Sequence, residues 1–419
     1  MIAVSLCMIV RDEEEVLARC LDSVADLVDE IVIVDTGSVD RTKEIAAQYN
    51  ARIVEFEWIE DFAAARNFSF AQATQTYVMW LDADDVLFEK DREKFRKLKQ
   101  SLPPEVDSVI MEYHLTFDMA GNAAAGSRRN RLVKRSMGYQ WHNPIHEYLE
   151  VSEGNIMLTD IAISHKRMGD HSDRNMRIFK KQVADGKELL GRDLYYFANE
   201  LVDQKEYAEA VQSYTLFLQG PVEYSEDHML ACSKLAECYH HLGRKDKKLE
   251  SLLLAFKYDV PRADFCCSIA FCFEEQEAWP LAIHWYNMAL GLEKPAFSMG
   301  LLNLVCWTWL PHVQLCICYA KVGELRKAME HNDKALHYLP DDANLKDNKR
   351  RLEEILQIHN DVKRRHKDGQ EQVQGQVEEQ VQEQVQEQEQ EQGPEQGQVE
   401  DQEQGQVQGQ DSGQDGGIV

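Results

Sequence analysis

The stretch YVMWLDADD, residues 77–85, decides how the N-terminal part of this chain is interpreted. Its first five residues are apolar and typical of a buried strand, and three carboxylates follow within the next four positions. Like charges this close repel one another unless a positive group lies between them. A divalent cation held by one or two carboxylates and by substrate phosphates would supply that charge. The alternative is an acidic turn that caps the next helix, because Asp is a good N-cap.

Strand-like and helix-like segments alternate along the first 170 or so residues. Strands are expected at residues 3–10, 30–35, 51–56 and 77–81, and helices at residues 13–25, 41–49 and 62–73. This alternation predicts βαβ units and a mainly parallel sheet. Ligands bind outside the carboxyl ends of such strands, so we expect Asp35 and Asp82, which end two of them, to face one crevice. This second observation favours a binding site over a helix cap.

From about residue 193 the pattern is helical only, and it repeats. Aligning Tyr207, Lys245, Trp279 and Leu325 gives spacings of 38, 34 and 46 residues, close to the 34-residue period of tetratricopeptide helix pairs. The third unit departs from the pattern, with Pro280 near the start of its second helix and a long connection to the fourth. Stacked helix pairs would form a curved surface that can bind another chain. A purely structural helical domain is the alternative.

These patterns divide the chain into three parts. We expect an α/β domain over residues 1–175, an all-α domain of tetratricopeptide-like repeats over residues 176–365, and a low-complexity tail rich in Gln and Glu over residues 366–419. The tail has no aromatic residues and cannot bury enough apolar surface to offset the entropy cost of ordering, so we expect it to be disordered.

The charge of the chain argues against two classes of partner. The formal net charge is −27, and the 14 acidic residues from Asp368 onward, with no Lys or Arg among them, leave −13 for residues 1–367. This part lacks the basic footprint of a nucleic-acid-binding protein, and it would not be attracted to anionic lipid.

The apolar segments and the cysteines indicate a cytoplasmic protein. No segment reaches the roughly 18 apolar residues of a membrane-spanning helix. The apolar run over residues 2–10 has no positive region before it, so we interpret it as a strand and not as a signal peptide. The ten cysteines include no CxxC pair and no metal-ligand spacing, which favours free core cysteines in a reducing compartment.

Four segments taken together resemble the family 2 glycosyltransferases, which have the GT-A fold. They are SLCMIVRDEEEVLARCLDSV (residues 5–24), VDTGSVDRT (34–42), FAAARNFSFAQAT (62–74) and VMWLDADD (78–85). Each segment alone is a weak signal, but four in the order of the family are specific. The resemblance implies an inverting transferase with a nucleotide sugar, such as a UDP-sugar, as donor and a divalent metal ion, Mg²⁺ or Mn²⁺, as cofactor.

The second strand end is the candidate nucleotide-binding segment. Asp35 can accept hydrogen bonds from a base or a ribose. Gly37 and Ser38 then form a tight turn whose backbone can approach a ligand closely. Asp40 has two equal interpretations, as part of this site or as a helix cap.

Two arginines and the three carboxylates of residues 82–85 lie beside the same strand ends. Arg11 and Arg66 would suit a diphosphate, although either could instead be a partner of Asp82 or Asp85. By the resemblance, Asp82 contacts the ribose region and Asp84 ligates the metal. For Asp85 two interpretations stay open, a contact with the sugar and a helix N-cap.

Two later segments complete the expected site. Trp141 can offer an apolar face to the donor sugar. An inverting transfer needs a base that deprotonates the nucleophile; Glu147, with His146 beside it on the acceptor side, is favoured over Asp85. By the resemblance, His165 completes the metal shell, and neutral imidazole is a suitable ligand. A structural role is the alternative for each histidine.

A short GT-A domain followed by tetratricopeptide helices resembles the bacteriocin peptide glycosyltransferases of the sublancin type. That resemblance implies a Cys or Ser side chain of a peptide as acceptor and a homodimer formed through the helical repeats. Two alternatives stay open. The first is a glycosyltransferase that acts on a cell-envelope glycan, and the second is a non-catalytic tetratricopeptide adaptor with a degenerate GT-A domain.

Overall fold

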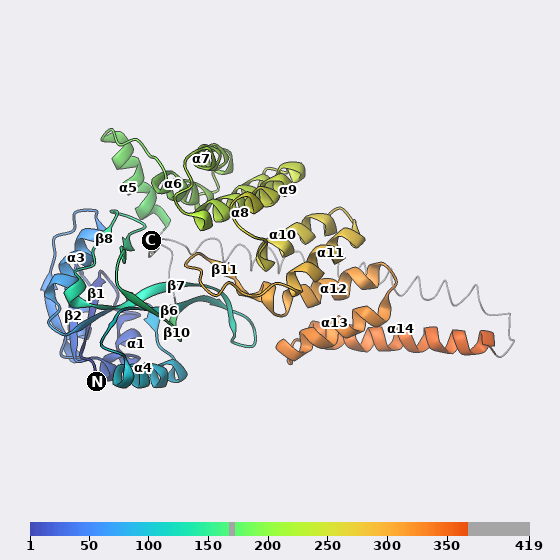
Figure 1. Ribbon diagram of the computed structural model, residues 1–419, viewed down its shortest axis with the longest axis horizontal. Coiled ribbons are helices and arrows are strands. Elements are labelled where there is room, and N and C mark those ends of the chain that lie inside the picture. The colour runs from blue at the N-terminus through green and yellow to red at the C-terminus, as the bar shows by residue number, and fades with distance from the viewer. Residues whose placement is uncertain (167–171, 368–419) are drawn as a thin grey trace.

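The structure is a computed structural model that describes residues 1–166 and 172–367, and it shows a mixed α/β domain followed by an array of paired helices (Figure 1). The low-complexity segment expected at residues 366–419 lies almost entirely outside the described residues. The α/β domain has the GT-A-like architecture that the sequence predicted.

One large sheet forms the centre of the α/β domain. Its strands follow the order β3-β2-β1-β4-β7-β6-β10-β5, and β11 pairs with β7 beside this path. The strands are β1 (Val4–Val10), β2 (Glu30–Asp35), β3 (Arg52–Glu55), β4 (Tyr77–Trp80), β5 (Asp85–Val86), β6 (Val106–Phe117), β7 (Ala123–Lys134), β10 (Asn155–His165) and β11 (Leu302–Asn303). A separate hairpin consists of β8 (Trp141–His142) and β9 (Tyr148–Leu149).

The sheet is mixed, and its first half is parallel. Strands β3, β2, β1 and β4 run parallel, with register pairs such as Val10↔Asp35, as the βαβ alternation predicted. Beyond β4, β7 is antiparallel to both β4 and β6, β10 is parallel to β6, and β5 is antiparallel to β10. The expectation of a mainly parallel sheet therefore holds for the first half, and the second half is mixed. The connection from β6 to β7 is a short turn, and a turn can join only antiparallel neighbours.

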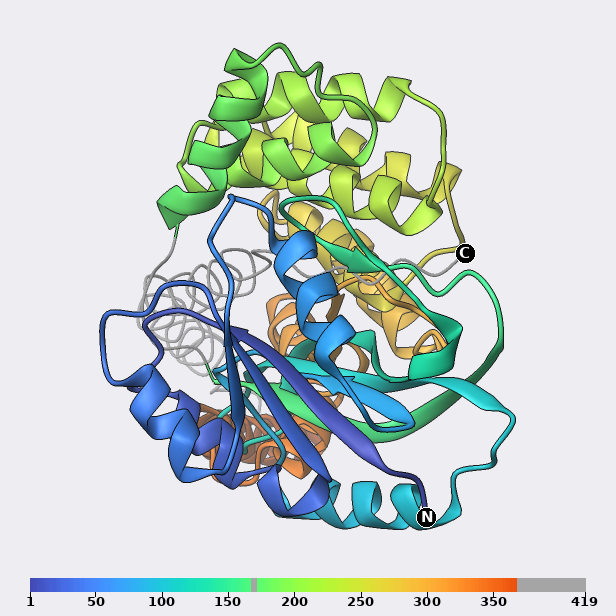
Figure 2. The same ribbon diagram turned by 90° about the vertical axis from the view of Figure 1, so that its left-hand side faces the viewer.

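Helices cover both faces of the sheet. Along β1, Leu6 and Met8 pack with Leu17 of α1 (Leu17–Asp22) and Phe95 of α4 (Glu89–Ser101), and α2 (Thr42–Gln48) lies on the same face. Cys7, between them in sequence, points to the opposite face, where α3 (Phe62–Gln72) and the β8–β9 hairpin pack. Figure 2 shows α3 and α4 on opposite sides of the sheet. Two short 3-10 helices complete this domain, at Ala25–Leu27 and Arg135–Met137.

The remaining helices form tetratricopeptide-like pairs that follow one another in an arc (Figure 1). The pairs are α6 (Arg192–Asp203) with α7 (Tyr207–Gln219), α8 (Ser225–His241) with α9 (Lys245–Leu254), α10 (Ala263–Glu274) with α11 (Trp279–Leu290), and α12 (Leu310–Lys321) with α13 (Leu325–Tyr338). Helix α5 (Ser172–Ala184) precedes them and α14 (Ala343–Lys367) follows; 3-10 helices lie at Ala255–Lys257 and Leu304–Trp307. The four residues aligned from the sequence are each the first residue of the second helix of a pair.

The long connection between the third and fourth pairs returns to the α/β domain. Within it, β11 pairs antiparallel with β7 through Leu302↔Gly126. Arg128 and Arg129 of β7 donate hydrogen bonds to carbonyl oxygens of the same connection, at 2.6 and 3.1 Å. Gly126 is required here, because a Cβ at this position would lie 2.6 Å from the carbonyl oxygen of Tyr113. The helical region is therefore not all-α, since it supplies a strand to the sheet.

Two other expectations concern the cysteines and the membrane. All ten cysteines lie in the described residues, are buried and form no disulfide, as predicted for core residues. Among the described helices, none combines the length and the apolar character needed to cross a membrane.

A histidine pair between α12 and α13 predicts a pH-dependent stability. His312 Nδ1 lies 3.0 Å from His331 Nδ1. Burial, and then the neighbouring His331, lower the pKa of His312 from 6.5 to about 4. Between pH 6.5 and about pH 4, His312 binds a proton in the unfolded chain but not in the folded chain, so the free energy of unfolding falls as pH falls. We expect the free energy of unfolding to decrease by roughly 1–2 kcal/mol from pH 7 to pH 5 through this group, allowing for its partial exposure.

Urea unfolding of the wild type and of His312→Gln at both pH values measures this contribution. The variant should lose less stability between pH 7 and pH 5 than the wild type does. Equal losses in the two proteins would show that the histidine pair does not titrate as described.

Candidate functional site

Three potential metal ligands meet where β4 ends. Asp84 follows β4, and Asp85 begins β5, which pairs antiparallel with the end of β10 so that Asp85 lies opposite His165. His165 Nδ1 is 3.3 Å from Asp84 Oδ1 and 3.6 Å from Asp85 Oδ1. One ligand atom from each residue lies within 4.8 Å of the others, and this is the group of three in the described residues that could hold a metal ion. The sequence suggested Asp84 and His165 as ligands; the structure adds Asp85.

Asp85 is fixed more firmly than its neighbours. Its side chain is 0% exposed, Oδ2 lies 3.0 Å from Arg131 Nη1, and the same oxygen accepts a hydrogen bond from the Asp82 backbone N–H at 3.0 Å. Burial would raise the pKa of Asp85, but Arg131 and His165 hold it below its usual value. The other oxygen, Oδ1, is buried without a hydrogen bond. An ionised carboxylate with one buried, unsatisfied oxygen aimed at two further ligands fits a cation.

The imidazole of His165 carries positive charge between these carboxylates. Burial would lower its pKa, but the neighbouring carboxylates of Asp84 and Asp85 raise it to about 10. Tyr113 Oη lies 3.0 Å from the same Nδ1 atom. Since metal ligation needs the neutral imidazole, a bound cation would replace this proton and take over its charge.

Arg66 is a buried partner of two carboxylates. Its side chain is 3% exposed, with Nη2 2.8 Å from Asp82 Oδ1 and Nε 2.7 Å from Glu147 Oε1. The guanidinium packs against the rings of both Trp80 and Trp141, at 4.9 and 4.8 Å from their centroids. This matches the alternative in which Arg66 pairs with Asp82. Trp141 is itself 3% exposed, so its ring supports Arg66 and presents no open face to a sugar.

Burial and neighbouring charges raise the pKa of two carboxylates at the strand ends, Asp82 and Glu13. Burial is the largest cause that raises the pKa of Asp82, to about 7, although Arg66 opposes it. Glu13, which follows β1, has its pKa raised to about 7 by burial and by Asp84 and Asp82. The strand ends therefore hold more negative charge than the arginines balance, which again favours a cation.

The two residues of the His-Glu pair point in different directions. Glu147 is buried against Arg66, within the carboxylate cluster. His146 turns away from it: Nε2 lies 3.0 Å from Glu200 Oε1 of α6, and the ring stacks on Tyr196 with centroids 4.1 Å apart. The structure therefore brings Glu147 but not His146 to the other site residues.

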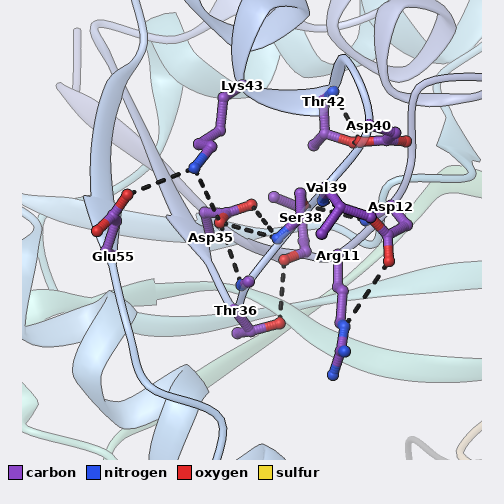
Figure 3. A network of polar contacts seen from close by, with 12 residues as sticks. Arg11, Asp12, Asp35, Thr36, Ser38, Val39, Asp40, Thr42, Lys43 and Glu55 are labelled. Carbon is purple, nitrogen blue, oxygen red and sulfur yellow. Dashed lines mark hydrogen bonds and ion pairs between the residues drawn. The ribbon is translucent and has the colours of Figure 1, made fainter.

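The loop after β2 is shaped by hydrogen bonds to Asp35 (Figure 3). Asp35 Oδ2 accepts from the backbone N–H groups of Gly37 and Ser38, each at 3.1 Å. Gly37 has φ of 104°, a conformation that glycine adopts readily. Ser38 Oγ accepts from the backbone N–H of Asp12 at 3.0 Å, which joins this loop to the one after β1. Lys43 Nζ lies 3.9 Å from Asp35 Oδ2.

The remaining residues of this loop pair have structural or peripheral positions. Asp40 accepts from the backbone N–H groups of Thr42 at 2.9 Å and Glu14 at 3.0 Å, so its carboxylate ties the start of α2 to the loop after β1, while Arg41 is the N-cap residue of α2. Arg11 is exposed, with Nε 3.8 Å from Asp12 Oδ2 (Figure 3).

Sequence reasoning missed three contributors to this site. Glu13 lies in an acidic run that looks like a solvated helix start. Arg131 lies within a strand, where only the fold reveals that it pairs with Asp85. Arg174 of α5 stacks on Phe62, with its guanidinium carbon 4.5 Å from the ring centroid, and comes from the helical region. No spacing in the sequence links these residues.

Comparison with known proteins assigns the domain that carries this site. Residues 5–151 match the family model described as glycosyl transferase family 2. The N-terminal part of the chain is therefore a family 2 glycosyltransferase domain, in agreement with the resemblance of its four segments.

Three relatives are similar to the chain over this part. A TPR repeat-containing protein of Synechococcus elongatus is 40% identical over 153 residues, which are 36% of each chain. The SPbeta prophage-derived glycosyltransferase SunS of Bacillus subtilis is 27% identical over 143 residues, 33% of each chain. The lipopolysaccharide core biosynthesis glycosyltransferase LpsC of Rhizobium meliloti is 28% identical over 160 residues, 36% of this chain and 58% of LpsC. The match thus spans about a third of the length of the first two relatives.

The unequal burial of the two adjacent aspartates predicts unequal effects on stability. Asp85→Asn would leave Arg131 with a buried, unpaired charge, which costs about 3–5 kcal/mol. Asp84 is partly exposed, and its partner His165 still has Asp85 beside it, so we expect Asp84→Asn to change stability by less than about 1 kcal/mol. Thermal unfolding of both variants beside the wild type measures the difference. Similar melting temperatures for the two variants would contradict the burial of the Asp85–Arg131 pair.

Proposed function

We propose that this protein is an inverting glycosyltransferase that moves a sugar from a nucleotide sugar, a UDP-sugar in the first instance, to an acceptor. The observation that carries the proposal is the triad of Asp84, Asp85 and His165 at the end of β4, of which Asp84 and Asp85 lie in the segment that matches family 2. The buried, unsatisfied Oδ1 of Asp85 supports a cation at this place.

The triad would hold the divalent metal ion, Mg²⁺ or Mn²⁺. When bound, such an ion neutralises the charge that develops on the leaving nucleoside diphosphate. Arg11, exposed beside the loop after β1, adds a cation that suits the diphosphate. The base and the ribose are assigned to the loop of Asp35, Gly37 and Ser38 and to Asp82.

Glu147 is the proposed general base. Its Oε1 accepts the hydrogen bond from Arg66 Nε, which orients the carboxylate and leaves Oε2 as the atom that takes the proton from the acceptor. Asp85, the alternative base, is fully buried and paired with Arg131, so it serves better as a metal ligand. His146 is assigned a supporting role and not a chemical one, because it faces Glu200.

The acceptor is proposed to be a Cys or Ser side chain of a peptide or protein. The array of paired helices supports this choice, because stacked helix pairs form surfaces that bind other chains, and the resemblance to the sublancin-type peptide glycosyltransferases agrees with it. Self-association through the same helices, giving a homodimer, is the second use proposed for them; sedimentation of the full chain tests it. We place the protein in the cytoplasm, as its free cysteines suggest.

An acceptor in the cell envelope is the second candidate function. The specific observation in its favour is the similarity to LpsC, whose name assigns it to lipopolysaccharide core biosynthesis. Assays with a peptide acceptor and with a truncated lipopolysaccharide core, using one donor, distinguish the two. A non-catalytic adaptor is disfavoured, because the carboxylates at the strand ends are all present.

Loss of the metal site should abolish turnover without unfolding the protein. Asp84→Asn removes one ligand at a partly exposed position, so we expect donor turnover to fall at least about 100-fold while the melting temperature stays near wild type. Chelation with EDTA should have the same effect and be reversed by Mn²⁺ or Mg²⁺. Release of UDP from a UDP-sugar is the measurement. Activity that survives both treatments would rule out the metal assignment.

Removal of the proposed base should affect the chemical step alone. We expect Glu147→Gln to lower kcat roughly 10²-fold or more, the usual scale for a general base, with donor binding nearly unchanged. The amide keeps an acceptor oxygen for Arg66 and preserves the shape of the site. Transfer assays that are stopped at timed intervals give kcat, and titration calorimetry with UDP gives the dissociation constant of the nucleotide. An unchanged kcat would return the role of base to Asp85.

A further inference from the structure

The loop that carries Glu147 has a left-handed backbone at two residues and needs contacts from the surrounding structure to stabilise it. It joins β8 to β9, and two of its residues other than glycine, Asn143 and His146, have φ of 70° and 51°. L-residues rarely adopt this left-handed region, and bulky side chains do so only where the surrounding structure imposes it. Some part of the protein must therefore hold the loop in place.

The contacts that hold it come mainly from the helical region. Ile145 is buried in a cluster with Phe179 of α5 and residues of α6. The imidazole of His146 stacks on Tyr196 of α6 with an interplanar angle of 6°, and its Nε2 pairs with Glu200 Oε1 at 3.0 Å. All of these residues are buried. Helix α3 also holds the loop, because the carbonyl oxygen of Pro144 accepts from the backbone N–H of Phe62 at 2.8 Å, and Glu147 Oε1 accepts from Arg66 Nε at 2.7 Å.

Glu200 is itself held rigidly. It is 2% exposed, and the same oxygen that pairs with His146 accepts a hydrogen bond from Asn175 Nδ2 of α5 at 3.0 Å. A buried carboxylate is costly unless it is paired and hydrogen-bonded, so the geometry of these three side chains is tightly constrained.

We propose that Glu200 is a positioning residue for Glu147, and that the helical region is thereby part of the catalytic machinery. Glu200 fixes His146, the peptide bond from His146 fixes Glu147, and Glu147 fixes Arg66, which holds Asp82 at 2.8 Å. The inference rests on the proposed function, in which Glu147 is the base. It assigns the first helix pair a role in chemistry that is distinct from acceptor binding.

Glu200→Ala breaks this connection, and Asn199→Ala is the matched control. Asn199 is the preceding residue on α6, is also buried, and hydrogen-bonds Tyr214 within the first helix pair, away from the loop. Glu200→Ala removes two buried hydrogen bonds, from His146 and from Asn175, and Asn199→Ala removes one, from Tyr214. We expect Glu200→Ala to lower kcat for UDP-sugar turnover at least about tenfold with KM for the donor within about twofold. Asn199→Ala should keep kcat within about twofold of the wild type.

The conservative variant separates positioning from general destabilisation. Glu200→Gln keeps an amide oxygen that can accept from His146 Nε2 and from Asn175, so it should recover most of the kcat lost in Glu200→Ala. A defect that is as deep in Glu200→Gln as in Glu200→Ala would overturn the positioning role.

Hydrogen–deuterium exchange of the peptides covering residues 140–150 gives a readout that does not depend on activity. Exchange should be faster in Glu200→Ala than in wild type and unchanged in Asn199→Ala. If Glu200→Ala does not fold, Asn175→Ala, which removes only the hydrogen bond that fixes Glu200, replaces it with the same expected directions.

The outcomes distinguish this inference from the proposed function. A folded wild type without donor turnover would refute the proposed function, while the exchange experiment would still test whether Glu200 holds the loop. A wild type that turns over donor, together with a folded Glu200 or Asn175 variant that keeps both wild-type kcat and wild-type loop exchange, would refute the positioning role alone.

Discussion

Carboxylates crowd the end of β4, and two buried guanidinium groups make this arrangement possible. Arg66 pairs with Asp82 and Arg131 pairs with Asp85, and both lie over the ring of Trp80, at 4.9 and 3.8 Å from its centroid. Burying an ion pair costs about as much desolvation energy as its attraction returns, so these pairs contribute little net stability. What they provide is a fixed position for each carboxylate, which leaves Asp84 and one oxygen of Asp85 directed at His165.

The same arrangement divides the charged residues into two groups. Arg66 and Arg131 are committed to protein carboxylates and are too deeply buried to meet a diphosphate. Among the described residues, the groups that remain for a charged ligand are Arg11, exposed beside the β1 loop, and Arg174 of α5, together with the cation that the triad would hold. Because the arginines do not balance all of the carboxylates, an anionic donor needs further positive charge to enter with it, which agrees with a metal-dependent transfer.

Much of the frame could be predicted from the sequence, because it depends on local patterns. The strand that ends at Asp82, the parallel half of the sheet and the first residues of four helices follow from periodicity and turn chemistry. The contact partners of the charged and aromatic side chains could not be predicted in the same way. Whether Arg66 meets a phosphate or Asp82, and whether the ring of Trp141 is open or covered, depends on elements far apart in sequence. The direction of His146 depends on α6, and the antiparallel direction of β7 depends on the short turn that joins it to β6.

The sequence pattern separates the α/β domain from the helical region, but in the folded chain the two pack against each other. The connection between the third and fourth helix pairs adds β11 to the part of β7 that extends beyond β4, and α6 holds the loop of Glu147. Removal of the helices would expose backbone groups of β7 as a new sheet edge and release a loop whose backbone is left-handed at two residues. A truncated chain would therefore lose activity whether the helices bind an acceptor, join two subunits or position the base. Only single substitutions on α6, matched residue by residue, separate these roles.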